Sequence, residues 1–248
     1  MNSLTIQPTF QARYPQTKQI RKNTCIIRNS SNTRATEKSS FWSLADRFIT
    51  NYIKSRKKDN YSKEPISYWI EKNLENQGVN VRFKNNSKLA QYIQTGIDIL
   101  NEKKIELPKN ILFMSPIFSK LGIFGLTYML SDKKESPIIL PKNIGEISER
   151  EICKKRGNYF SSRSRLHIFF HEVGHWLHHQ TGFDIEKNTR IWNTINKEEI
   201  AKKVSKQAIQ CEDGSDFCAE VFASQILDNE LDDNIIELAK KLNAPLIK

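Results

Sequence analysis

The sequence has few cysteines, and their spacing excludes a structural zinc site built from cysteine pairs. Cys25, Cys153, Cys211 and Cys218 are spread along the chain, and no two of them form a CxxC motif. A chain of 248 residues can bury one sizeable core or two small ones, so it needs no disulfide bonds for stability. We therefore expect all four thiols to be reduced.

Uninterrupted apolar runs are also scarce. The first thirty residues never gather the roughly 7–15-residue apolar core of a secretory signal, so a cytoplasmic location is the default expectation and only non-classical export stays open. Residues 111–130 are mostly apolar, but they are interrupted by Ser115, Pro116, Ser119, Lys120 and Gly122. We expect two buried strands joined by a turn at this place, and no membrane span.

The formal net charge of +11 is concentrated near the N-terminus. Residues 1–63 contain 13 Lys and Arg against 3 Asp and Glu, whereas residues 150–248 contain 15 of each kind. Residues 1–40 are polar and lack apolar periodicity, which predicts a disordered basic arm. Residues 41–76 form a predicted helical segment whose first helix is amphipathic and ends in the basic cluster KSRKK.

That first helix has two interpretations. Its apolar face could dock on the core while the cations are merely solvated. Alternatively, the arm and the cluster bind an anionic partner, which would be a nucleic acid, a membrane or a protein.

Periodicity along the rest of the chain predicts an α+β protein, with helices followed by a small sheet and then by further helices. A cap at Asn86 or Ser87 favours a helix start at that point. After the helix at 65–77, the expected helices span 88–104, 165–180, 196–209, 215–227 and 232–242, and the expected strands span 79–83, 110–115, 123–130 and 136–141.

All five histidines of the chain fall within the segment RLHIFFHEVGHWLHHQ. On a helix, His171 and His175 project from one face and can bind a single metal ion. Glu172 lies beside them, where a carboxylate can accept a proton from water. This is an HExxH motif, and its apolar neighbours predict a buried helix whose polar groups need a partner such as a metal.

The other three histidines are expected to be neighbours of the site rather than ligands. His167 is one turn before the motif and could border the cleft, while His178 and His179 lie toward the helix end, where cations suit the helix dipole. The alternative for the whole helix is a set of core histidines with ordinary hydrogen bonds and a salt bridge at Glu172.

A catalytic zinc site needs a third protein ligand and an open position for water. No histidine follows His179, so the ligand must be a carboxylate or a thiolate, and the best source is the helix in EDGSDFCAEVFASQIL. Asp216 and Glu220 share one face of that helix, so one can bind zinc while the other hydrogen-bonds the free nitrogen of a ligand histidine. Cys218 lies on a different face and is expected to pack in the core.

The stretch FFHEVGHWLHH, followed by DFCAEVFA, resembles the gluzincin group of HExxH zinc metallopeptidases. The resemblance is to the catalytic domain of anthrax-lethal-factor-like proteins in particular, and the segment is also similar to the immunity-regulator metallopeptidases of mobile elements. It implies that His171 and His175 are zinc ligands and that Glu172 is the general base. It further implies Asp216 as the third ligand and Glu220 as the carboxylate that orients a ligand histidine, with Glu220 as the alternative third ligand.

The same resemblance implies a zincin-like domain over residues 77–248, with residues 89–104 as a backing helix and residues 136–141 as the edge strand beside the cleft. Two positions depart from the family pattern. Asp216 stands where the family has Glu, and Ile209 stands where lethal-factor-like domains have a tyrosine that helps to stabilise the oxyanion. Some other donor would have to take that role.

The motif and the resemblance together predict a zinc-dependent metallopeptidase. It would be an endopeptidase that hydrolyses peptide or protein substrates with a zinc-activated water and Glu172 as general base. The alternative is a catalytically degenerate zinc-binding protein whose basic arm binds the anionic partner.

Overall fold

The computed structural model describes residues 65–117, 124–128, 130, 132–154 and 158–247 of the chain. The basic arm expected at residues 1–40 and the amphipathic helix expected before residue 58 lie outside these ranges. None of the helices in the described ranges is both long enough and apolar enough to span a bilayer.

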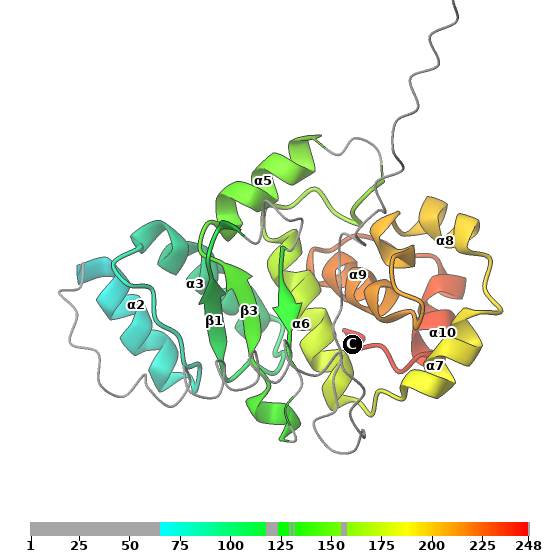
Figure 1. Ribbon diagram of the computed structural model, residues 1–248, viewed down its shortest axis with the longest axis horizontal. Coiled ribbons are helices and arrows are strands. Elements are labelled where there is room, and N and C mark those ends of the chain that lie inside the picture. Colours follow the sequence, from blue (N-terminus) through cyan, green and yellow to red (C-terminus); the bar gives the residue numbers. More distant parts are fainter. Residues whose placement is uncertain (1–64, 118–123, 129, 131, 155–157, 248) are drawn as a thin grey trace, which may run out of the picture.

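The predicted α+β class and the small mixed sheet are confirmed. In chain order the elements are α2 (Pro65–Asn76), α3 (Ser87–Glu102), β1 (Ile111–Met114), β2 (Leu126–Thr127), η2 (Lys133–Glu135), β3 (Ile138–Pro141), α5 (Ile144–Lys154), α6 (His167–Gln180), α7 (Ile185–Trp192), α8 (Lys197–Lys203), η3 (Gln207–Ile209), α9 (Ser215–Ile226) and α10 (Asp233–Lys241). The sheet lies beside α6, and α7 to α10 lie on the far side of α6 from the sheet (Figure 1).

The sheet is ordered β1-β3-β2, with β1 parallel and β2 antiparallel to β3. Ile138 and Leu140 face the main apolar core, while Ile139 faces a small cluster on the other side of the sheet. The expectation that residues 136–141 form the edge strand is therefore wrong, because β3 is central and buried along its length. The edge strand that contacts α6 is β2, and residues 79–83 contribute one isolated bridge instead of a strand.

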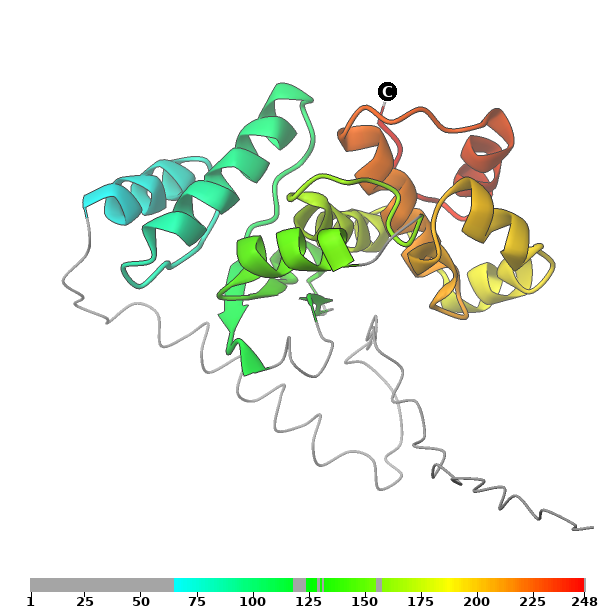
Figure 2. The same cartoon turned by 90° about the horizontal axis from the view of Figure 1, so that it is seen from above.

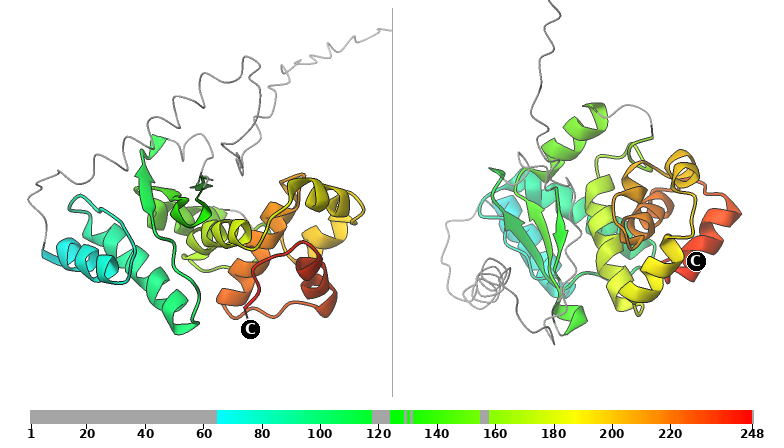
Figure 3. Two further views of the ribbon diagram at one scale, coloured as in Figure 1. Left: turned by 90° about the horizontal axis from the view of Figure 1, so that it is seen from below. Right: turned by 45° about the vertical axis from the view of Figure 1, so that its right-hand side comes forward.

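The main core is formed by residues of α2, α3, α5 and α6 together with one face of the sheet. α3 begins as predicted, because the Asn86 side chain accepts a hydrogen bond from Leu89 N at 3.0 Å. Gly96 of α3 leaves room for α6, since a Cβ at this position would lie only 2.6 Å from Cδ1 of Phe169. Figures 2 and 3 show α6 in the middle of the molecule, between α2 and α3 at one end and α7 to α10 at the other.

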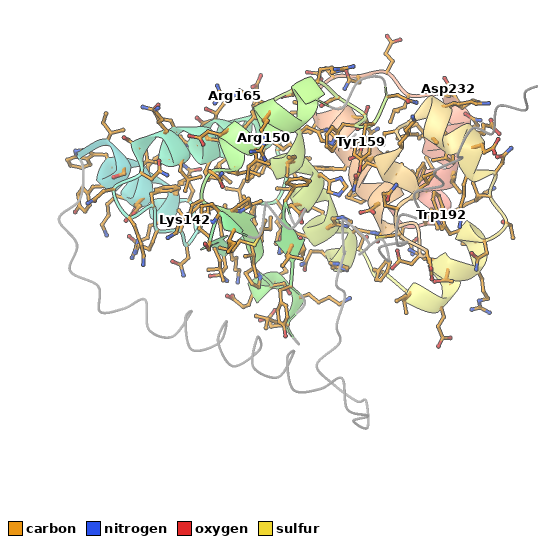
Figure 4. The ribbon with its side chains drawn as sticks, turned by 45° about the horizontal axis from the view of Figure 1, so that its top comes forward. Lys142, Arg150, Tyr159, Arg165, Trp192 and Asp232 are labelled. Carbon is orange, nitrogen blue, oxygen red and sulfur yellow. The ribbon has the colours of Figure 1, made fainter. Side chains whose placement is uncertain are left out.

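α9 lies between two apolar clusters. Phe222 and Ile226 pack in the main core, whereas Phe217 and Val221 pack in a second core that includes Trp192. Trp192 lies on the far side of α6 from the sheet (Figure 4). The flanks of α9 are thus fixed by packing on both sides, which leaves a third face for close contact with α6.

The helix expected at residues 196–209 is interrupted. After α8, the backbone amides of Lys206 and Gln207 donate to the carbonyl oxygens of Asn158 and Tyr159 at 2.9 Å each, so they cannot take part in a continuous helix. The chain resumes as the short η3. The structure also contains two helices that the sequence patterns do not predict, α5 and α7.

Candidate metal centre

α6 carries the HExxH motif and crosses α9 at close range. A Cβ on Gly174 would lie 2.9 Å from Ala219 Cα and 3.1 Å from Ala219 O, so glycine permits the two backbones to approach. Every residue of α6 from His167 to His179 is buried, as the apolar neighbours of the motif predict. The crossing brings the polar residues of α9 against those of α6.

Three side-chain donor atoms converge between these helices. His175 Nε2 lies 3.0 Å from His171 Nε2 and 3.2 Å from Asp216 Oδ1, and His171 Nε2 lies 3.5 Å from the same oxygen. With bond lengths near 2.0–2.1 Å, two ligand atoms of a tetrahedral zinc ion lie about 3.3 Å apart. The three separations bracket that value, so His171, His175 and Asp216 could hold a metal ion.

The donor group is buried, and its carboxylate has an unused oxygen. Asp216 is 1% exposed, and among the described residues no hydrogen-bond partner reaches its buried Oδ2. Burial would raise the pKa of the Asp216 carboxyl, but hydrogen bonds from His171 and His175 lower it to about 2. An anion of this kind beside two imidazole nitrogens fits a divalent cation.

Glu220 lies behind His171 rather than in the donor group. Its Oε1 is 2.7 Å from His171 Nδ1. Because a carboxylate only accepts, Nδ1 carries the hydrogen, and in the neutral ring Nε2 keeps a lone pair directed at the donor group. Glu220 Oε2 accepts from Ser205 Oγ at 2.7 Å and from Ser161 N at 2.8 Å. Both oxygens of Glu220 are therefore already engaged.

His167 is the second imidazole on Glu220, with its Nε2 2.8 Å from Oε1 and its Nδ1 3.1 Å from Ser162 Oγ. It does not border a cleft as expected, because its side chain is fully buried. Burial opposes ionisation of Glu220, but His167 and His171 hold the pKa of Glu220 well below its usual value. These three residues also form a compact donor group. Glu220 Oε1 lies 2.7–2.8 Å from one ring nitrogen of each histidine, which is a hydrogen-bonding distance. It is shorter than the roughly 3.3 Å expected between two ligand atoms of a zinc ion.

The two ring nitrogens of His171 thus have different surroundings, and His171 links the donor group to the hydrogen-bonded network behind it. Burial would lower the pKa of the His171 imidazole, but hydrogen bonds to Asp216 and Glu220 raise it well above the usual value. A divalent cation would replace the positive charge that these two carboxylates otherwise draw onto the ring.

The Glu172 side chain packs against β2 and the residue before it. Thr127 Oγ1 is 3.1 Å from Glu172 O and 3.4 Å from Glu172 Oε2. A Cβ on Gly125 would lie 2.5 Å from Glu172 Cγ and nearer still to its carboxylate. Burial raises the pKa of Glu172, and the opposing influence of His175 and His171 only partly offsets it. A buried carboxylate of raised pKa is suited to accepting a proton and passing it on.

His178 and His179 belong to the core. His178 Nε2 donates to Leu242 O at 2.8 Å, and the His179 ring contacts Phe183 at a centroid distance of 5.2 Å. In the part of the chain that the structure describes, neither nitrogen of His179 has a hydrogen-bond partner. Burial lowers the pKa of His178 to about 4 and that of His179 to about 2. The expectation of cations at the helix end is therefore wrong, because both rings are removed from water.

Cys218 is buried in the second core, which is the packing position expected for it. Burial raises the pKa of its thiol well above the usual value, so it is protonated and unsuited to binding a metal at neutral pH. Cys218 and Cys211 are both free thiols.

The sequence patterns miss the residues that reach the site from other segments. Ser161 precedes α6, Ser205 lies between α8 and η3, and Thr127 lies on β2. A single serine or threonine carries no local signal for such a role, because its partner is fixed only by tertiary packing. Gly125 does carry a signal, since a glycine inside a strand-like run indicates close approach by another group.

No protein-family model, no curated protein and no solved structure matches this chain. The resemblance to the gluzincin metallopeptidases therefore stays a prediction that depends on short motifs in α6 and α9.

Proposed function

We propose that this chain is a zinc-dependent metallopeptidase with a zincin-like domain. The observation that carries the proposal is the donor group, in which His171 Nε2, His175 Nε2 and Asp216 Oδ1 lie 3.0–3.5 Å apart. Two imidazoles and one carboxylate leave the fourth position of a tetrahedral ion open, as hydrolysis requires. Glu172, the residue after His171, would supply the carboxylate that acts on water at that position.

Zinc is the metal that the donor set favours, because nitrogen and oxygen atoms at tetrahedral spacing suit it. The charges support a divalent ion as well, since Asp216 and Glu220 are two buried anions whose pKa values lie below the ordinary range. A bound zinc ion would supply a Lewis acid and lower the pKa of water at the site to near neutrality.

Within this proposal, the base, the metal ligands and Glu220 have separate roles. Glu172 accepts a proton from the attacking water and passes it to the leaving amine. Burial raises the pKa of Glu172, which favours the first of these transfers, because a more basic carboxylate accepts a proton more readily. Asp216, His171 and His175 hold the metal, and Glu220 keeps His171 in the tautomer that exposes Nε2.

A peptide is the substrate class that the sheet favours. Within the described residues β2 pairs only with β3, so its second edge can hydrogen-bond an extended peptide backbone. β2 contacts α6, and Thr127 and Gly125 lie against Glu172. An extended chain added to this edge would therefore pass close to the proposed base.

The test is Glu172→Gln, compared with the parent and with Glu237→Gln, a matched change at an exposed position of α10. Zinc content is measured by elemental analysis, and cleavage is measured by mass spectrometry on a library of unstructured peptides. We expect all three proteins to retain about one zinc per chain and only Glu172→Gln to lose hydrolysis. Cleavage by Glu172→Gln at the parental rate would show that the base is assigned to the wrong residue.

One observation favours the catalytically degenerate alternative. Ile209 occupies the position of the expected oxyanion-stabilising tyrosine, and it packs against the second core, so no hydroxyl is offered there. Parent protein that contains zinc and cleaves no member of the library would support a metal-binding protein that acts through its basic arm.

A further inference from the structure

The edge strand β2 and the residue directly before it make two contacts with Glu172 that the metal ligands do not require. The hydroxyl of Thr127 reaches both the backbone oxygen and the carboxylate of Glu172, at 3.1 and 3.4 Å. The backbone at Gly125 lies so close to the side chain that a Cβ would fall 2.5 Å from Glu172 Cγ. Gly125 comes directly before β2 and Thr127 lies on it, so both act on Glu172 from the same short segment.

From these contacts we infer that β2 holds the Glu172 carboxylate in its working position, with Thr127 as a positioning residue and Gly125 as the gap that the carboxylate fills. The inference rests on the proposed function, because it treats Glu172 as the base. It goes beyond that function by assigning a role to an edge strand whose other side is available to a peptide.

The need for such a support follows from the chemistry of glutamate. Its side chain has three rotatable bonds, and a base must meet its proton within hydrogen-bonding distance. A misplacement of about 1 Å costs on the order of 100-fold in rate. The absence of a Cβ at Gly125 leaves room for the rotamer that places the Glu172 carboxylate against this backbone. The bond from Thr127 favours the same rotamer, because it keeps Oε2 near the strand.

Threonine suits this role better than serine because its branched Cβ restricts the side-chain rotamer. Thr127 is only 3% exposed, so water competes little for the hydrogen of its hydroxyl group. The hydroxyl group of Thr127 has one hydrogen, which can be donated to either of two acceptors on Glu172. Thr127 therefore links both the backbone of α6 and the side chain of the base to the same strand.

The first experiment measures the contact without reference to activity. Gly125→Ala is introduced into the parent and into Glu172→Ala, and melting temperatures are compared. In the parent the added methyl group meets the carboxylate, and we expect the melting temperature to fall by about 5 °C. In Glu172→Ala the space is free, and Gly125→Ala should change the melting temperature by less than about 1 °C. Equal losses in both backgrounds would overturn the inference.

The second experiment measures positioning. Thr127→Val removes the hydroxyl and keeps the shape, and we expect kcat to fall about ten-fold or more while KM and zinc content stay at the parental values. Thr127→Ser should recover most of the lost kcat. Full activity in Thr127→Val, or joint loss of kcat, KM and zinc in both variants, would contradict the role. A parent that cleaves nothing would sink the proposed function, and the melting temperatures would then decide alone whether β2 holds the carboxylate.

Discussion

Gly174→Ala is the substitution with the sharpest consequence for the metal centre. It adds one methyl group at the point where α6 crosses α9, 2.9 Å from Ala219 Cα and 3.2 Å from Phe222 Cβ. Cβ contacts essentially never fall below 3.0 Å, and ordinary contacts begin at 3.4 Å, so restoring an ordinary contact requires the two helices to separate by 0.5 Å, the difference between 3.4 and 2.9. The neighbour is backbone and cannot rotate away.

That separation is large on the scale of metal coordination. Ligand distances in a working site hold to within about 0.2 Å, and Asp216 lies one turn before Ala219 on the helix that must move. We expect metal affinity to fall at least about ten-fold, the loss typical when the orientation of a ligand is disturbed. Stability should also fall, because overpacking costs about 1–3 kcal/mol whereas the better helix propensity of alanine returns at most about 1 kcal/mol.

The assay is a zinc titration against a competing chelator, together with thermal unfolding of the metal-free protein. Gly145→Ala on α5 is the matched control, because the nearest atom to its new Cβ is a side-chain carbon of Tyr92 on α3 at 3.3 Å, and not an atom of the crossing between α6 and α9. Gly145→Ala should keep the parental zinc affinity. If Gly174→Ala binds zinc as tightly as the parent and melts at a higher temperature, then helix propensity governs this position and the close crossing does not.

Two further predictions concern the ligands and acid stability. Asp216→Ala should lose stoichiometric zinc, whereas Glu220→Ala should keep it with an affinity weakened about 10–100-fold; the reverse result in an equilibrium dialysis would exchange the two roles. Because the pKa values of His178 and His179 are lowered to about 4 and about 2, the unfolded chain takes up their protons first as the pH falls below about 6.5. The stability from these neutral rings is complete above that pH and decreases below it, by about 2 kcal/mol per ring between pH 7 and 5. His179→Leu should remove its share of this loss in urea titrations, and parallel loss in parent and variant would contradict the assignment.

The helices that form the site could be predicted from the sequence because their signals are local. The spacing of His171 and His175 on an apolar helix predicts α6, and the pair Asp216 and Glu220 on α9 follows from the need for a third ligand. The structure brings Asp216 to the Nε2 atoms and Glu220 to the opposite nitrogen of His171. Which carboxylate faces which nitrogen depends on the helix crossing, and the sequence therefore leaves both orders open.

The errors have a common physical origin in contacts between distant segments. The sequence does not show which strands flank β3, and for that reason β3 is expected at the edge of the sheet. The apolar run IILP nevertheless indicates burial on both faces. The prediction that His178 and His179 are cations assumes that the end of α6 is exposed to water. Residues such as Leu242 and Phe183 cover that end instead. The break after α8 is equally nonlocal, since it depends on the carbonyl groups of Asn158 and Tyr159, nearly fifty residues earlier in the chain.

The position of α9 between the two cores has a consequence for how the protein unfolds. His171 and His175 lie on α6, whose apolar residues pack in the main core, whereas Asp216 lies in the first turn of a helix that also carries Phe217 and Val221 of the second core. A shared metal ion would act as a cross-link between these two halves and make their unfolding cooperative. Without it, the layer of α7 to α10 would open at a lower free energy than the sheet and α6. The supply of that metal would then set the lifetime of the folded chain against proteolysis.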